Sequence, residues 1–458
     1  MSAVDRSKLP EVGAEAAFHF PAIAKHHLAN GLEVRTVEHA ALPVVTLVLL
    51  VRGGLGADPL GKEGLAALTA DMLDEGTGTD SAIDISDRLA RIGGDYDLDV
   101  RDDATVLTLT TLSRFADRGA ALLADLAVRP SLREEDLQRV RAQRLNRLVQ
   151  LKDSPGARGE QAFLQVVYGS HPYGHLSIGR AASLATLTRD DVAAFHAAVY
   201  RPERATLVVA GDGTHAELLA IAERAFGGWA ASSADAASHA PEATAAPSVP
   251  STRLGLVHRD QAAQSILSIG QLSPARSTPD YAPLVVMNAA LGGQFVSRVN
   301  LKLREEKAYT YGARTGFTWR RGPGTFSLDT SVETKVTRDA LADAMAELDD
   351  IRHARPVSAT ELELAKASLT RGYSRNFETA GQVARSAAQL SLFGLPDSYF
   401  ERFVPMVQAV TAEEVSLAAQ KYLDPSRMTA IVVGDKEAIA GPLESLGLGE
   451  PTELGLED

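Results

Sequence analysis

The feature that most constrains the fold of this chain is an internal duplication. Segments 188–212 and 411–435 align without a gap, and each ends in an apolar run followed by Gly-Asp, at Gly211-Asp212 and at Gly434-Asp435. The other matched pairs are Thr188/Thr411, Val192/Val415, Pro202/Pro425, Arg204/Arg427, Thr206/Thr429 and Val209/Val432. Each copy has the pattern of a helix, a proline turn and a buried strand. A repeat of this size predicts two homologous domains.

The length of the chain supports the same organisation. Its 458 residues exceed what one hydrophobic core usually serves, so at least two domains are expected. Between the two copies, Ala230–Thr252 is rich in Ala, Ser, Thr and Pro and has no periodic apolar face, which is typical of an exposed linker. We therefore expect an N-terminal domain over 1–229, a linker over 230–252 and a C-terminal domain over 253–458.

The order of the predicted elements favours an α+β fold. In the first half we expect strands at Val44–Val51 and Thr105–Thr110 and a helix at Phe115–Ala127. In the second half we expect a strand at Gln264–Leu272, a helix at Tyr281–Leu291, and a hairpin of Ala308–Trp319 with Thr325–Val332. Strands and helices come in blocks rather than in strict alternation, which argues against a parallel Rossmann sheet.

Composition excludes several classes of function. The net charge is -13 with no basic block, which argues against nucleic acid as a partner. The absence of cysteine excludes disulfides, thiolate nucleophiles and Cys-ligated zinc. The early apolar run Val44–Val51 is too short to span a membrane. Residues Met1–Pro10 contain no apolar signal core, which favours the cytoplasm, whereas a chain that had been processed would fit the periplasm.

One segment, Gly64–Thr77, has the pattern of a core-facing helix. Its apolar residues Leu65, Leu68 and Met72 recur at helical spacing. The segment resembles the zinc-binding helix of the pitrilysin or insulinase-like metallopeptidases, the family of the mitochondrial processing peptidases and their smaller bacterial relatives. In active members this helix carries His-x-x-Glu-His. Here Ala67 replaces the first His, Ala70 the catalytic Glu, and Asp71 the second His.

The resemblance implies a third zinc ligand, a Glu on a helix some way further along the chain. We expect that helix at Leu137–Lys152, which contains no acidic residue. It carries four arginines instead, at Arg139, Arg141, Arg144 and Arg147. His171 and His175 are separated by Pro172 and Gly174, so we interpret them as surface turn residues. We therefore expect no metal site in this chain and no zinc cofactor of its own.

A second element of the same family is kept in the other half. Residues Leu303–Gly312 resemble the family's substrate-binding element, with Arg304 and Tyr311 at the expected separation. The resemblance implies that Arg304 binds a substrate carbonyl and that Tyr311 donates its hydroxyl to the oxygen on which charge develops. The family commonly has Gly where this chain has Ala308.

From spacing alone, two alternatives to these roles stay open. Arg304 could pair with a neighbouring carboxylate while Tyr311 packs in a core. Tyr309 could take the place of Tyr311, since both would lie on one face of an extended strand. We interpret the neighbouring Glu305-Glu306, and Arg320-Arg321 further on, as solvated surface charges.

The resemblance covers nearly the whole chain, and it implies two homologous domains, each a mostly antiparallel sheet packed with helices. A chain with the Arg/Tyr element and without the metal ligands suggests a subunit that is inactive alone. It would form a heterodimer with a homologous His-x-x-Glu-His subunit that supplies the zinc and the general base. The substrate would be a short unfolded peptide, bound as an added strand. The alternative is a degenerate paralogue that binds peptides or scaffolds a complex without cleaving anything.

Overall fold

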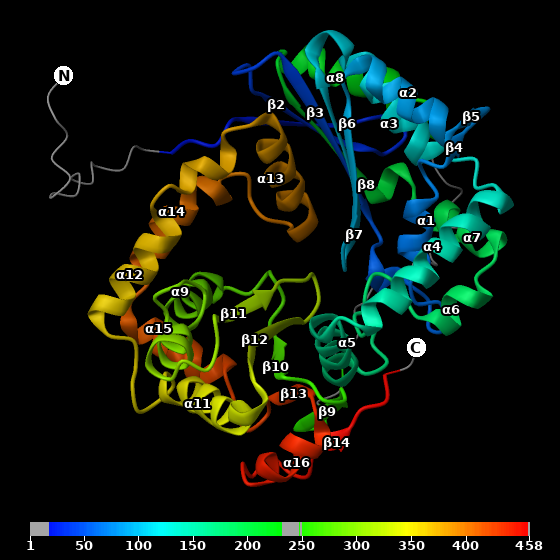
Figure 1. Ribbon diagram of the computed structural model, residues 1–458. Coiled ribbons are helices and arrows are strands. Elements are labelled where there is room, and N and C mark those ends of the chain that lie inside the picture. Colours follow the sequence, from blue (N-terminus) through cyan, green and yellow to red (C-terminus); the bar gives the residue numbers. More distant parts are fainter. Residues whose placement is uncertain (1–17, 231–246, 248–249, 457–458) are drawn as a thin grey trace, which may run out of the picture.

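The computed structural model describes residues 18–230, 247 and 250–456 and contains two six-stranded sheets, one in each half of the chain (Figure 1). The predicted linker, 230–252, lies almost entirely outside the described residues, so the domain boundaries stay a prediction. Within the described ranges, no helix combines the length and the apolar character that a membrane span requires.

The first sheet has the strand order β1-β2-β8-β3-β7-β6. Its strands are β1 (Ile23–His27), β2 (Glu33–Glu38), β3 (Val44–Arg52), β6 (Asp95–Val100), β7 (Ala104–Leu112) and β8 (Ala205–Gly211). Strand β3 lies between β7 and β8, antiparallel to both. It is buried along nearly its whole length because its alternating side chains join apolar clusters on both faces of the sheet. Only the pairing of β2 with β8 is parallel.

The second sheet has the order β11-β12-β10-β13-β9-β14. Its strands are β9 (Leu254–His258), β10 (Gln264–Ser273), β11 (Ala313–Thr318), β12 (Gly324–Glu333), β13 (Thr429–Gly434) and β14 (Thr452–Glu453). Strand β10 lies antiparallel between β12 and β13, as β3 does between β7 and β8. Strand β13 pairs in parallel with β9, as β8 does with β2.

The two sheets therefore confirm the predicted duplication and the α+β fold class. The repeated Gly-Asp strands are β8 and β13, and they occupy equivalent positions in their sheets. The expected helix Tyr281–Leu291 is α9, with the same bounds. The hairpin prediction was wrong at its start, since β11 begins at Ala313 and residues 308–312 are not a strand.

Helices cover the sheets and connect their strands. In the first half they are α1 (Leu65–Asp71), α2 (Ala82–Ile92), α3 (Ala116–Val128), α4 (Glu134–Lys152), α5 (Pro155–Tyr168), α6 (Ala181–Thr186), α7 (Arg189–Val199) and α8 (His215–Phe226). In the second half they are α9, α10 (Arg298–Asn300), α11 (Thr337–Asp350), α12 (Ala359–Thr370), α13 (Ala380–Phe393), α14 (Tyr399–Ala409), α15 (Ala412–Tyr422) and α16 (Lys436–Glu444). A two-stranded ribbon, β4 (Gly76–Thr77) with β5 (Asp80–Ser81), follows α1.

One helix of each half packs against the sheet of the other half. Helix α5 packs on β10 and β13 of the second sheet, where Phe163 and Val167 join a cluster with Val433. Helix α13 packs on β3 and β8 of the first sheet, where Val383 contacts the apolar face that includes Val48. Because apolar area is removed from water on both sides, this exchange joins the two halves into one body (Figure 1).

Candidate functional site

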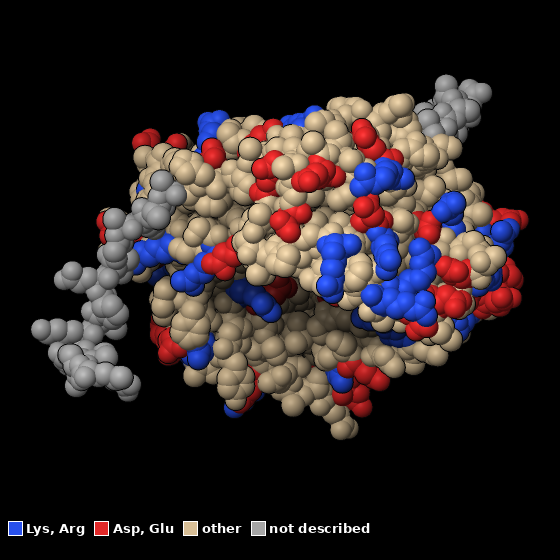
Figure 2. All heavy atoms as spheres, turned by 90° about the horizontal axis from the view of Figure 1, so that it is seen from above, with Lys and Arg blue, Asp and Glu red and all other residues tan. Residues whose placement is uncertain are grey.

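A large cavity lies between the two halves of the molecule. Its volume is about 1440 Å³, and residues of both sheets and of α4, α5 and α13 line it. Seen from above, the surface is hollowed between the halves, and Lys and Arg side chains gather along one side of the hollow (Figure 2). Of the three positions that replace the metal motif, only Asp71 lines this cavity.

Asp71, which stands at the position of the second motif histidine, forms an ion pair with Arg144. Arg144 of α4 donates from Nη1 to Asp71 Oδ2 at 2.7 Å and from Nη2 to the Ser177 carbonyl at 2.8 Å. Burial raises the pKa of the Asp71 carboxyl and lowers the pKa of the Arg144 guanidinium, and the charge of each partner opposes that effect on the other. The ion pair thus links α1 to α4 and places the positive charge of the Arg144 side chain beside Asp71.

The residues at this place do not fit a zinc ion. Ala67 and Ala70 are buried and have no donor atom, and Asp71 is already bound to Arg144. Among the described residues, no group of three His, Cys, Asp or Glu side chains lies close enough together to hold a metal ion. Zinc sites need three or four such ligands, so we derive no zinc chemistry for this chain.

Helix α4 differs at its start from the prediction. It begins at Glu134 rather than Leu137, so the prediction of a helix without acidic residues was wrong: Glu134, Glu135 and Asp136 form its first turn. Carboxylates are favourable there because they face the positive end of the helix dipole. Asp136 lies eight residues from Arg144, or roughly 12 Å along the axis, so these acids supply no ligand near Asp71.

A buried pair of Asp58 and His175 lies at the start of α1, the helix that carries Ala67, Ala70 and Asp71. Asp58 accepts the backbone N–H groups of Gly64 and Ala66 at 2.7 and 2.6 Å and so caps the start of α1. His175 places Nε2 3.5 Å from Asp58 Oδ2, and its Nδ1 lies 3.0 Å from the Leu176 carbonyl. His171 packs against Tyr168 and Tyr173. Both histidines are buried, so their interpretation as surface turn residues was wrong.

The stability of the fold is expected to fall with rising pH because of Asp58. Burial raises the pKa of this carboxyl from 3.8 to about 7, so the folded chain holds a proton there that the unfolded chain releases. The resulting stabilisation is present below about pH 4 and is lost as pH rises through about 7. Urea unfolding from pH 4 to 8 should show the wild type losing on the order of 2–4 kcal/mol relative to Asp58→Asn. Parallel profiles for the two proteins would contradict this assignment.

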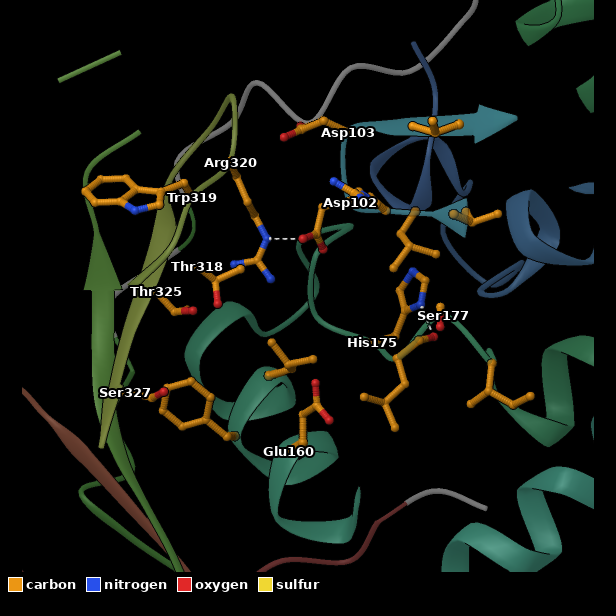
Figure 3. A pocket seen from close by; sticks show the side chains of 18 of the residues that line it. Asp102, Asp103, Glu160, His175, Ser177, Thr318, Trp319, Arg320, Thr325 and Ser327 are labelled. Carbon is orange, nitrogen blue, oxygen red and sulfur yellow. Dashed lines mark hydrogen bonds and ion pairs between the residues drawn. The ribbon is translucent and has the colours of Figure 1, made fainter. Parts of the chain in front are cut away.

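Arg320 crosses the cavity wall from the second half to the first. It lies in the loop between β11 and β12, and its Nε is 2.8 Å from Asp102 Oδ2, as Figure 3 shows. Its Nη1 donates to the Tyr168 hydroxyl at 2.5 Å, and its guanidinium lies over the rings of Tyr168 and Tyr173. Only 4% of Arg320 is exposed, so the interpretation of this residue as a solvated surface charge was wrong.

Arg304 lies on a π-helical turn, Leu301–Glu306, that follows α10. Its guanidinium lies 4.4 Å from the centre of the Phe295 ring, and Nη1 is 3.3 Å from Glu305 Oε1. That nitrogen is buried and makes no hydrogen bond within the described part of the chain. Arg304 therefore has a carboxylate neighbour, as the simpler interpretation allowed, but it keeps unused hydrogen-bonding capacity.

Tyr309 and Tyr311 have opposite environments. Tyr309 is partly buried and packs against the second core, whereas 94% of Tyr311 is exposed. The two residues are not on a strand, because Ala308 adopts φ +54 and turns the chain. That conformation favours glycine, the residue that the family commonly has there. Tyr311 therefore does not pack in a core, and the prediction that the two rings share a strand face was wrong.

Exposed apolar side chains accompany Tyr311 in the same part of the sequence. Phe295 is 64% exposed, and Val296 and Leu301 are 49% and 44% exposed. Asn300 holds this segment in place, since its amide donates to the Phe295 carbonyl and its Oδ1 accepts from the backbone N–H of Ala313. Neither Arg304 nor Tyr311 lines the cavity, so the structure separates the Arg/Tyr element from Asp71 and Arg144.

Asp58 and Arg320 have little signal in the sequence. The N-cap position of α1 is Gly64, six residues after Asp58, so the usual capping pattern does not mark this carboxyl. Arg320 pairs with Asp102, which is 218 positions away, and no local pattern marks such a contact.

The chain is similar in sequence to a known family of peptidases. Residues 34–175 match the family model described as Insulinase (Peptidase family M16), and residues 186–369 match that of the Peptidase M16 inactive domain. An uncharacterized zinc protease of Mycobacterium tuberculosis is 27% identical over 411 residues, which cover 89% of this chain and 92% of that protein. One from Streptomyces coelicolor is 22% identical over 415 residues, 90% of either protein.

Solved structures share the whole arrangement. The crystal structure of a peptidase M16 inactive domain from Pseudomonas fluorescens has a TM-score of 0.83 at 26% identity, covering 90% of this chain and 98% of that one. A protease from Helicobacter pylori has a TM-score of 0.85 at 19% identity, covering 91% of this chain and 100% of that one, a likeness that shows the fold.

Proposed function

Since the chain belongs to the insulinase-like peptidase family M16 and its residues do not fit the family's zinc, we propose that it is the non-catalytic, substrate-binding subunit of a heterodimeric zinc peptidase. A homologous partner with His-x-x-Glu-His supplies the zinc and the general base. This chain supplies Arg304 and Tyr311. The substrate is a short unfolded peptide.

The main support for the proposal is a contrast between the zinc-helix segment, residues 64–77, and the Arg/Tyr element, residues 303–312. In the zinc-helix segment, Ala67 and Ala70 are buried without donor atoms and Asp71 is bound to Arg144, so these positions offer no free metal ligand. The Arg/Tyr element is presented to solvent: Tyr311 is 94% exposed, and Phe295 beside Arg304 is 64% exposed. Exposed apolar groups gathered on an ordered segment are typical of an interaction surface. Coverage by a partner and its peptide would remove this apolar area from water.

The chemistry of the two side chains suits a reaction at a peptide carbonyl. A tyrosine hydroxyl donates one hydrogen bond, and such a donor stabilises the transition state when negative charge develops on the carbonyl oxygen. The arginine fork can hold another carbonyl of the same peptide in place. Tyr311 lies two residues before β11, an outermost strand of its sheet, where an extended peptide can add main-chain hydrogen bonds.

The proposal is tested first on the purified chain and then with its partner. The candidate partner is a reading frame of similar length beside this one, with His-x-x-Glu-His and without the Arg/Tyr pair. We expect metal analysis to find less than a tenth of a zinc per chain here, roughly the level of adventitious binding. We also expect the two chains to co-purify. One tightly held zinc in this chain, or peptide cleavage by this chain alone, would contradict the proposal.

A further inference from the structure

Some arginines of the cavity have no carboxylate partner. The lining contains seven arginines and five acidic residues, so it is net positive, whereas the whole chain is strongly negative. Arg144 and Arg320 are neutralised by Asp71 and Asp102. Arg147 of α4 and Arg385 of α13 make no hydrogen bond or ion pair with any residue in the described ranges, and both line the cavity.

Each of these two arginines has a glutamine one helical turn away on the same face. Gln143 precedes Arg147 by four positions on α4, and Gln389 follows Arg385 by four positions on α13. All four side chains line the cavity. Both helices line the cavity, and they lie apart in the fold, with α13 on the left and α4 on the right of Figure 1. The cavity therefore presents a charged donor and an amide on each of two walls.

We propose that this cavity selects peptides that carry carboxylate groups, and that Arg147 and Arg385 are the specificity-determining residues. The inference rests on the proposed function, because it names the class of peptide that the subunit holds. An arginine fork matches a carboxylate with two parallel hydrogen bonds. Unpaired charge of one sign in a concave site also raises the local concentration of ligands of the opposite sign.

The acidic residues of the second sheet oppose this attraction only in part. Asp329 accepts hydrogen bonds from the hydroxyls of Ser268 and Ser327, and it lies opposite Arg314 in the pairing of β12 with β11. Glu160 of α5 lies on the same side, and burial together with Asp329 and Asp102 raises the pKa of its carboxyl. Arg147 of α4 and Arg385 of α13 come from other elements, and within the described residues neither forms an ion pair with Asp329 or Glu160.

The test measures direct binding to the purified full chain, without the partner. Fluorescent peptides of one length carry Glu, Gln or Lys at the same positions, and fluorescence anisotropy gives the Kd of each. We expect the Glu peptide to bind about tenfold more tightly than the Gln peptide, with the Lys peptide weakest. Arg147→Gln and Arg385→Gln should each weaken the Glu peptide about fivefold and leave the Gln peptide unchanged.

Arg91→Gln serves as the control, because Arg91 is an exposed residue of α2 outside the lining and its loss should change no Kd. Equal affinity for the Glu and Gln peptides, or a Glu preference that survives the double arginine variant, would overturn the inference. The proposed function fails separately, through the absence of cleavage by the assembled pair. A chain that binds acidic peptides through these arginines but activates no peptidase would keep the inference and reject the enzyme subunit.

Discussion

Tyr311→Phe is expected to lower kcat of the assembled peptidase by about a hundredfold, the usual cost of one oxyanion donor. The substitution removes only a hydroxyl, and that hydroxyl makes no hydrogen bond within the described residues, so neither the fold nor the assembly should change. The effect should fall on kcat, because the hydroxyl interacts with charge that develops only in the transition state. Steady-state cleavage of a quenched peptide by the assembled pair provides the measurement.

Tyr309→Phe is the matched control. Its ring packs against the second core through carbon atoms, so removal of the hydroxyl should leave kcat within about twofold of wild type. Arg304→Ala should change both KM and kcat, because the arginine of the wild type would hold the peptide in the ground state as well as in the transition state. If Tyr311→Phe and Tyr309→Phe were equally active, Tyr311 would have no catalytic role and the scaffold alternative would stand.

Arg320→Met is expected to lower the free energy of unfolding by about 3 kcal/mol, the lower end of the cost of breaking a buried ion pair. Arg320 is almost completely buried, and its loss leaves Asp102 without its ion-pair partner. The Tyr168 hydroxyl loses the hydrogen bond from Arg320 and keeps the one that it donates to the Pro323 carbonyl. Methionine keeps much of the volume, so the loss comes from charge and hydrogen bonding rather than from a cavity. Urea denaturation followed by circular dichroism measures the change.

Arg314→Met is the control for this experiment. It lines the same cavity from β11 but is exposed and makes no ion pair with the described residues, so its loss should cost less than about 0.5 kcal/mol. Equal stability of the Arg320 and Arg314 variants would show that the contact with Asp102 does not hold the halves together.

The parts of the fold that were predictable are those that local patterns encode. The duplicated Gly-Asp strands and the buried strand at β3 follow from apolar runs with turn residues at their ends, and the structure places them as expected. The start of β11 was not predictable, because the left-handed backbone at Ala308 occurs in a residue that usually avoids it. The exchange of α5 and α13 between the sheets was not predictable either, because the apolar face of an amphipathic helix does not specify which sheet it packs against.

The candidate site, too, could be predicted from the sequence only in part. The loss of the metal ligands is a property of single positions, Ala67, Ala70 and Asp71, and is visible in the sequence. The ion pair of Asp71 with Arg144 joins residues 73 positions apart, and only the packing of α1 against α4 creates it. The roles of Arg304 and Tyr311 come from the family resemblance, and they stay a proposal that the experiments above address.

A titration of this chain into a fixed amount of its His-x-x-Glu-His partner, with peptide cleavage and zinc content measured together, tests whether the chain is a peptidase subunit. We expect negligible cleavage by either chain alone and a rise in activity that saturates at one copy of each. We also expect about one zinc per pair, carried by the partner, as a site with three protein ligands requires. Full activity of the partner alone, unchanged when this chain is added, would contradict the role of a subunit.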